Sequence, residues 1–288
     1  MASIKESVAS WASILATLFT IIAFIQSEPW LATTSVTFLG VSLYTALVAR
    51  RKRLALNSAT ITIEGRSIDS LNLANLRRRV NRSLVIQEVN RVATIRGPDL
   101  NIESDYAGFC RAKREAAFEF SIDADNHVPF HHLQCVGYDL LRDPGRKNPI
   151  RPLLRGADGN SKKIAVPFLA PLRERQPFRM LLHCTMPDCM KAGIDYYAAA
   201  LSFDQDTDPR SVVRLVFVGD MPQWIRVYEA NGQRAPRLLK DLPVCFETPQ
   251  YREYVDEAGN VAGQSVRIYV FNRPAIGQDF AAPLAPAA

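Results

Sequence analysis

The sequence lacks the motifs on which most enzyme mechanisms depend. Its 288 residues include only four histidines, and no G-x-S-x-G nucleophile motif accompanies them. It has neither the phosphate-binding loop G-x-x-x-x-G-K-[ST] nor the dinucleotide fingerprint G-x-G-x-x-G. We therefore expect no catalytic residue, no cofactor and no enzymatic activity, with an unrecognised hydrolase as the alternative.

Cysteine is scarce and irregularly spaced. The five cysteines are Cys110, Cys135, Cys184, Cys189 and Cys245. Their odd number argues against a disulfide framework and fits a reducing cytosol. His183-Cys184 with Cys189, and His131-His132 with Cys135, could supply metal ligands, but neither group has the C-x₂-C pairing typical of zinc. We interpret Cys110, Cys135 and Cys184 as small core residues and expect no metal.

Charge is almost missing from the N-terminal part. Glu28 is the one charged residue between Ser7 and Ala49, and it separates two uncharged stretches of 21 residues, Ser7–Ser27 and Pro29–Ala49. A helix of that length spans about 30 Å, the thickness of a bilayer's hydrocarbon core. The sequence therefore predicts a transmembrane helical hairpin over residues 1–53. The alternatives are a signal peptide, which here lacks a small-x-small cleavage site, and a buried helical pair in a soluble protein.

Basic residues predict the orientation of this hairpin. Four consecutive positive charges follow the second stretch, whereas the connecting loop holds only Glu28. The positive-inside rule places both termini of the two-span protein in the cytoplasm. The small residues Ala16 and Gly40 allow close helix packing, so we expect a homo-oligomer in the lipid bilayer. The predicted membrane-interface residues are Trp11, Trp30, Tyr44, Arg50, Arg51, Lys52 and Arg53.

A basic connector is predicted over residues 54–96. Residues 50–96 hold eleven Arg or Lys and three acids, a net charge of 11 − 3 = +8 in a chain whose total is +6. Apolar residues recur at helical spacing, which predicts an amphipathic helix over Ser70–Asn90, either packed on the domain or lying on anionic lipid. The basic residues of this helix are Arg77, Arg78, Arg79 and Arg82. No aromatic residues are interleaved with them, so nucleic acid is not an expected partner.

From residue 97 the pattern changes to short alternating apolar runs separated by turn residues. Phe118, Phe120 and Ile122 alternate with polar residues, as in a half-buried strand. The strands that we predict are 60–63, 118–122, 133–141, 163–168, 178–184, 196–203, 212–218, 224–229 and 265–271. They indicate a cytosolic antiparallel β-sandwich over residues 97–274, followed by a disordered tail over 275–288.

The middle of this domain resembles an immunoglobulin-like sandwich. A Pro-rich crossing, Val166–Leu172, precedes the strand at Phe178, and Tyr196 or Tyr197 stands near the start of a later strand. In that family such a tyrosine bonds back to the chain at a corner. The resemblance covers Ala116–Val218 and departs from antibody domains in lacking a Cys…Trp…Cys frame. It implies a domain that binds a ligand or a protein partner.

The order of segments resembles the two-transmembrane-helix effectors of bacterial anti-phage defence. The likeness rests on Ser7–Ala49, on Arg50–Arg53 and on the β-rich remainder. It implies that the soluble domain senses a signal and that the spans then assemble and perturb the inner membrane. The alternative is a passive membrane anchor that carries a protein-interaction module in an envelope or trafficking complex. The sequence names neither the ligand nor the partner.

Overall fold

The computed structural model describes residues 44, 60–69, 81, 83–122, 128–158, 161–202, 210–231, 235–258 and 264–273. The chain divides into two compact units, residues 1–59 and 60–288. In the first unit only Tyr44 is described, and it is helical and exposed. The other predicted membrane-interface and span-packing residues, the four arginines of the predicted basic helix and the tail over 275–288 lie outside the described residues.

Within the described part of the chain, no helix has both the length and the apolar character needed to cross a bilayer.

The second unit is built from β-strands, which confirms the prediction of a mainly β domain. The described elements are β1 (Thr60–Ile63), β2 (Arg66–Asp69), β3 (Leu84–Arg96), β4 (Asp99–Cys110), β5 (Arg114–Ile122), a short 3-10 helix η1 (Phe130–His132), β6 (Gln134–Asp139), β7 (Leu153–Asp158), β8 (Ser161–Arg173), β9 (Pro177–Met186), β10 (Ile194–Ser202), β11 (Arg210–Val218), β12 (Ile225–Asn231), β13 (Arg237–Asp241), β14 (Val244–Thr248), β15 (Tyr251–Ala258) and β16 (Gln264–Asn272). Each predicted strand overlaps an observed one.

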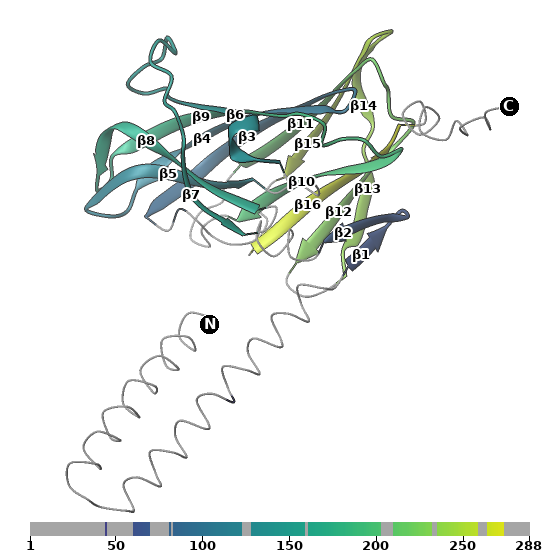
Figure 1. Ribbon diagram of the computed structural model, residues 1–288, viewed down its shortest axis with the longest axis horizontal. Coiled ribbons are helices and arrows are strands. Elements are labelled where there is room, and N and C mark those ends of the chain that lie inside the picture. Colours follow the sequence, from purple (N-terminus) through teal and green to yellow (C-terminus); the bar gives the residue numbers. More distant parts are fainter. Residues whose placement is uncertain are drawn as a thin grey trace, which may run out of the picture. The chain divides into compact units, whose positions relative to one another are not determined.

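Apart from the β1–β2 hairpin, these strands form one large sheet covered by two smaller ones (Figure 1). The large sheet has seven strands in the order β14-β15-β11-β3-β4-β9-β6. A four-stranded sheet, β10-β16-β12-β13, and a three-stranded sheet, β5-β8-β7, pack against the same face of it. The arrangement is a two-layer sandwich whose second layer is divided into two parts.

Two apolar clusters hold the layers together. The first joins the large sheet to the four-stranded one, with Phe217 of β11 packed against Phe271 of β16 at a ring distance of 5.0 Å. The second joins the large sheet to the three-stranded one, where Phe118 of β5 lies 4.7 Å from Tyr106 of β4 and 6.0 Å from Phe178 of β9. Alternate residues of each strand face inward because the side-chain period of a strand is two.

Strand β16 is buried on both faces. Tyr269 and Phe271 face the large sheet, whereas Val266, Ile268 and Val270 face outward and are covered by Ile63 and Ile68 of the β1–β2 hairpin, among others. A strand covered on both sides is largely apolar on both faces, as the run from Ile268 to Phe271 shows.

The predicted amphipathic helix is wrong for Leu84–Asn90, which begins the long strand β3. Leu84, Val89, Ala93 and Ile95 of this strand are buried, so its apolar spacing serves a sheet rather than a helix. The predicted domain boundary at residue 97 is also wrong, because β3 and β4 pair along their length as a hairpin that turns at residues 97–98.

The expectation of a purely antiparallel sandwich needs one correction. β11 pairs with β3 in parallel, from Arg210 opposite Glu88 to Val218 opposite Arg96, whereas every other strand pair in the described part of the chain is antiparallel. A parallel pair requires a crossover connection, and here the segment from β4 to β10 connects β3 to its parallel neighbour β11.

Candidate functional site

Charged and hydroxyl-bearing side chains lie between the large sheet and the four-stranded sheet, among otherwise apolar residues. In the large sheet, Arg91 of β3 is in register with Val213 of β11, and Val213 is in register with Asp256 of β15. All three therefore share one face, and Val213 and Asp256 are fully buried. Inward positions of a sandwich are normally apolar. A row with two charged residues at such positions is the most unusual feature of this interior.

The carboxylate of Asp256 is held by three side chains of the opposite sheet. Tyr269 donates its hydroxyl hydrogen bond to Oδ2 at 2.9 Å, and Arg267 donates from Nη1 to the same oxygen at 3.0 Å. The Lys240 ammonium lies 2.6 Å from Oδ1 and forms an ion pair with it, although the geometry is not that of a hydrogen bond. A buried carboxylate requires such compensation. Asp256 therefore joins β15 to β16 and β13 and has its charge neutralised.

Arg91 has a different environment. Its Nη1 donates to the backbone carbonyl of Ala200 at 2.8 Å, and its Nη2 donates to the Tyr106 hydroxyl at 3.3 Å. The guanidinium carbon lies 5.7 Å from the centre of the Tyr106 ring, within the range of a cation–π contact. No carboxylate of the described residues lies within ion-pair distance of it. Arg91 is thus a partly buried cation whose neighbours are neutral.

Tyr197 of β10 connects these two groups. Its ring stacks on the Tyr269 ring with the centroids 6.2 Å apart, and the residue is only 6% exposed. Burial raises the pKa of Tyr197 to about 12, and the nearby charge of Arg91 opposes that rise. Among the described residues its hydroxyl has no hydrogen-bond partner. The phenol is therefore neutral at physiological pH and retains an unused donor.

The inward position of Arg91 has a signal in the sequence. Arg91 stands in the alternating series Val89, Arg91, Ala93, Ile95, in which the other members are buried. A charged residue in the apolar register of a strand indicates a buried polar site. The pattern was missed because the predicted helix ended at Asn90 and the residues that follow it were assigned to the basic connector, in which no strand was predicted.

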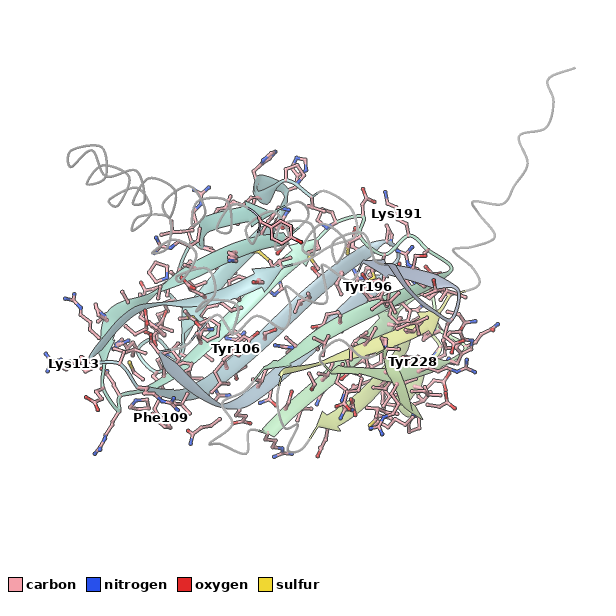
Figure 2. The ribbon with its side chains drawn as sticks, turned by 90° about the horizontal axis from the view of Figure 1, so that it is seen from below. Tyr106, Phe109, Lys113, Lys191, Tyr196 and Tyr228 are labelled. Carbon is pink, nitrogen blue, oxygen red and sulfur yellow. A yellow bond between two sulfur atoms is a disulfide. The ribbon has the colours of Figure 1, made fainter. Side chains whose placement is uncertain are left out.

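The outer layer of the domain carries a second set of polar contacts. Tyr228 and Tyr196, labelled in Figure 2 over the four-stranded sheet, belong to the face that is turned away from the large sheet. The Tyr228 hydroxyl donates to Glu64, which also pairs with Arg226 at 2.7 Å. These contacts attach the β1–β2 hairpin to β12 and satisfy the Glu64 carboxylate beside an apolar cluster.

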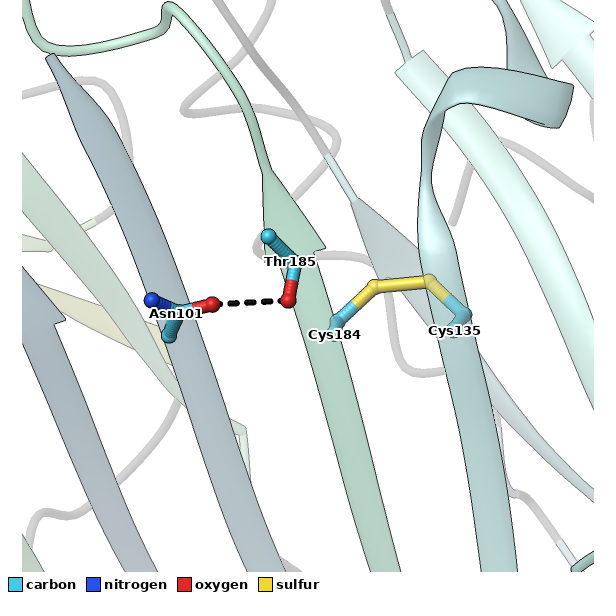
Figure 3. The surroundings of a disulfide bond; sticks show 4 residues. All are labelled: Asn101, Cys135, Cys184 and Thr185. Atoms are coloured by element: carbon cyan, nitrogen blue, oxygen red, sulfur yellow. Dashed lines mark hydrogen bonds between the residues drawn. A yellow bond between two sulfur atoms is a disulfide. The ribbon is translucent and has the colours of Figure 1, made fainter.

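The expectation that the cysteines form no disulfide framework needs a correction at Cys135 and Cys184. Cys135 of β6 and Cys184 of β9 lie directly opposite each other in the large sheet, with Cα atoms 4.2 Å apart, and form a disulfide (Figure 3). Their sequence separation is 49 residues, so no local spacing reveals the pair. One cysteine of each His/Cys group that could supply metal ligands, Cys184 and Cys135, is therefore in the disulfide, whereas Cys189 is a free thiol. Within the described ranges no three His, Cys, Asp or Glu residues gather as a metal site.

Two of the three other cysteines are shielded. Cys110 is buried, Cys189 is mostly buried and Cys245 is exposed. Burial raises the pKa of the Cys189 thiol to about 12, so this group remains a thiol at neutral pH. A thiol in that state is a poor nucleophile. Cys110 and Cys189 are therefore packing residues, as expected for Cys110 from the sequence.

No family model matches the chain, and no curated protein matches it. Among solved structures, the M1 zinc metallopeptidase from Deinococcus radiodurans is similar over 65% of this chain and 42% of that chain, at 12% identity and a TM-score of 0.38. A two-domain M1 zinc metallopeptidase variant bound to L-arginine is similar over 65% of this chain and 43% of that chain, at 10% identity and a TM-score of 0.38. The chain thus spans less than half the length of these structures. At TM-scores this low, the similarity indicates neither the fold family nor the function of this chain.

Proposed function

We propose that the chain is a membrane-anchored, non-enzymatic effector of bacterial anti-phage defence. In this proposal the β domain, an immunoglobulin-like sandwich in the cytoplasm, binds a ligand or partner, and the two spans then self-associate and perturb the inner membrane. The observation that carries it is the succession of two uncharged 21-residue stretches, a stop of four basic residues and a domain of β-sheets. The first two predict membrane insertion with the domain on the cytoplasmic side.

The polar interior of the domain supports a binding role. Arg91 and Tyr197 keep donors that the described residues do not use, in an interior that is largely apolar. Polar groups placed at a few points in an apolar setting are typical of ligand sites.

A second candidate function is a passive anchor with a protein-interaction module. The observation that favours it is strand β14, which forms one edge of the large sheet and whose five residues are all exposed. Val244 and Phe246 on this strand are 42% and 55% exposed. An exposed edge with apolar side chains can add a strand from another protein.

The two functions differ in what the spans do. We expect induced expression of the full chain to dissipate the membrane potential, measured with a potential-sensitive dye. Ala16→Leu with Gly40→Leu blocks close helix approach while preserving hydrophobicity, and we expect this double variant to insert normally but leave the potential intact. Leu15→Ile with Leu39→Ile is the control, because it exchanges one bulky apolar side chain for another.

A wild-type chain that neither depolarises cells nor forms oligomers under any inducing condition would leave the passive anchor as the function. Equal depolarisation by the double variant and the control would show that close packing at Ala16 and Gly40 has no part in the effect.

Topology requires a separate experiment, because two observations point in opposite directions. The basic stop Arg50–Arg53 predicts a cytoplasmic β domain, whereas a disulfide such as Cys135–Cys184 is typical of an oxidising compartment. With alkaline phosphatase fused after Ala288, we expect no activity, and Cys135 and Cys184 should resist alkylation after denaturation until a reductant is added. Active phosphatase would place the domain outside the cytoplasm.

A further inference from the structure

Arg91 and Tyr106 lie where the two parts of the second layer meet. Ala200, which accepts the hydrogen bond of Arg91, belongs to β10, the edge strand of the four-stranded sheet. Tyr106 packs against Phe118 of β5, an edge strand of the three-stranded sheet, at 4.7 Å. The seam, defined here by Arg91, Tyr106 and Tyr197, is therefore bordered by both small sheets and floored by β3 and β4. Figure 2 labels Tyr106 near the middle of the molecule in this view.

The seam has an excess of hydrogen-bond donors and positive charge. A guanidinium has five N–H donors, and Arg91 uses two of them, on Ala200 and Tyr106, so three remain without a partner among the described residues. The Tyr197 hydroxyl is likewise unused in the described part of the chain. A partly buried cation without a counter-charge is costly, which is why such arginines are normally paired.

The buried carboxylate of Asp256, in the same row as Arg91, does not supply that counter-charge. Asp256 is already bound by Tyr269, Arg267 and Lys240. Its negative charge is neutralised by two cations, so it neither pairs with Arg91 nor repels an anion placed beside Arg91. Among the described residues, no carboxylate therefore compensates the positive charge of Arg91 in the seam.

We infer that the seam is a binding site for a small oxyanion, the carboxylate or phosphate group of a ligand. The planar guanidinium of Arg91 fits two oxygens of such a group at once, and the Tyr197 hydroxyl donates to one of them. Binding supplies the missing counter-charge. The inference rests on the proposed function, since it names the chemistry of the ligand that the β domain binds.

A purely structural role for Arg91 makes different predictions. As a clamp, Arg91 would hold β10 on the large sheet through Ala200, and its replacement would lower stability without any effect of added anions. If Arg91 binds an anion, the stability of the domain depends on that anion, because a ligand that binds only the folded state raises the unfolding midpoint of the protein. The anion dependence therefore separates the two roles.

The test is a thermal unfolding series on the detergent-solubilised full chain in sodium chloride, sodium acetate and sodium phosphate at equal ionic strength. We expect acetate, phosphate or both to raise the midpoint above that in chloride. Acetate acting alone identifies a carboxylate ligand and phosphate acting alone a phosphate ligand. For the active anion, Arg91→Met should abolish the shift, and Tyr197→Phe should weaken binding about tenfold, the factor for one lost hydrogen bond to a charged group.

Arg214→Met is the matched control. Arg214 lies on β11 next to β3, pairs with Glu253 at 3.0 Å and is about half exposed on the outer face of the same sheet. This variant should keep the full shift. If Arg91→Met does not fold, Arg91→Lys replaces it, because it keeps the charge and loses the two-point contact, and it should weaken binding by about tenfold.

The inference is overturned if neither anion raises the midpoint, or if the Arg91 and Arg214 variants respond alike, which would indicate adventitious ion binding only. Its failure is separable from that of the proposed function. An anion shift that requires Arg91, in a chain that never depolarises cells, would keep the site and remove the effector role. Depolarisation that persists in a variant without the shift would keep the effector and remove the anion as its trigger.

Discussion

Tyr269 donates its phenol hydrogen bond to Asp256 across the boundary between the four-stranded and seven-stranded sheets, at 2.9 Å. Both side chains have no exposed surface. The same carboxylate receives Arg267 and Lys240, so the layers share one ionic contact inside an apolar interface. This contact fixes how β16 lies over β15, because a one-residue slip would leave the buried charges without partners.

Removal of this carboxylate should destabilise the domain strongly. Asp256→Ala leaves Arg267, with a side chain 12% exposed, and Lys240 without their counter-charge. We expect a loss of about 3–5 kcal/mol in the free energy of unfolding, measured by urea denaturation. The control Glu257→Ala removes an exposed carboxylate that lies 3.7 Å from Arg210, and it should change stability by less than about 1 kcal/mol. Equal effects would show that the buried contact adds nothing to stability.

Gly108 should not tolerate a side chain. A Cβ at this position would lie 1.9 Å from the carbonyl oxygen of Val85, a backbone atom of the paired strand β3. Backbone cannot rotate away, so we expect Gly108→Ala to cost about 3 kcal/mol of stability. Gly156→Ala is the control, because nothing lies within 4 Å of its Cβ, and it should stay within about 1 kcal/mol of wild type. An unchanged midpoint for Gly108→Ala would contradict the observed pairing of β3 and β4.

Stability should fall at alkaline pH because of the buried tyrosines. Burial raises the pKa of Tyr197 from its ordinary value of 10.0 to about 12, and burial followed by Asp256 raises the pKa of Tyr269 well above 10.0. The folded state then holds these protons more tightly than the unfolded state does. Their contribution is fully present below pH 10 and is lost as the pH rises from 10 towards 12.

Urea midpoints measured on both sides of pH 10 check this expectation. Tyr197→Phe removes one of the titrating groups, so this variant should lose less stability than wild type over the same interval. An identical decline in both proteins would mean that Tyr197 titrates normally in the folded state.

The position of β16 makes the C-terminal boundary sharp. A chain that ends after Arg273 keeps β16 and the buried Arg273 side chain, which donates to Gly97 and Met190 carbonyls at 2.6 and 2.5 Å. We expect it to remain as stable and monodisperse as the full chain. A chain that ends before Gln264 loses the strand between β10 and β12, which exposes two sheet edges, and it should aggregate on size-exclusion chromatography. Unfolding of the first truncation would contradict the Arg273 boundary.

The sequence alone predicted strands in which one face is buried and the other is exposed to solvent. Phe118, Phe120 and Ile122 alternate with polar residues and form β5 as expected. The same criterion missed β14, because all five of its residues are exposed and no alternation exists to detect. It also misassigned Leu84–Asn90, since apolar residues at Leu84 and upstream fit a helical period as well as a strand.

The sequence by itself determined that this chain has a charge-poor N-terminal segment, a basic stop and a β-rich domain, because composition and period are local properties. Tertiary structure alone decided that Cys135 faces Cys184, that β11 lies parallel to β3, and that Arg91 donates a hydrogen bond to the Ala200 carbonyl. Each of these relationships joins residues at least 49 positions apart. Such contacts form only when sheets stack and strands find their register, and the free energy that selects them comes from burying whole faces rather than from any local pattern.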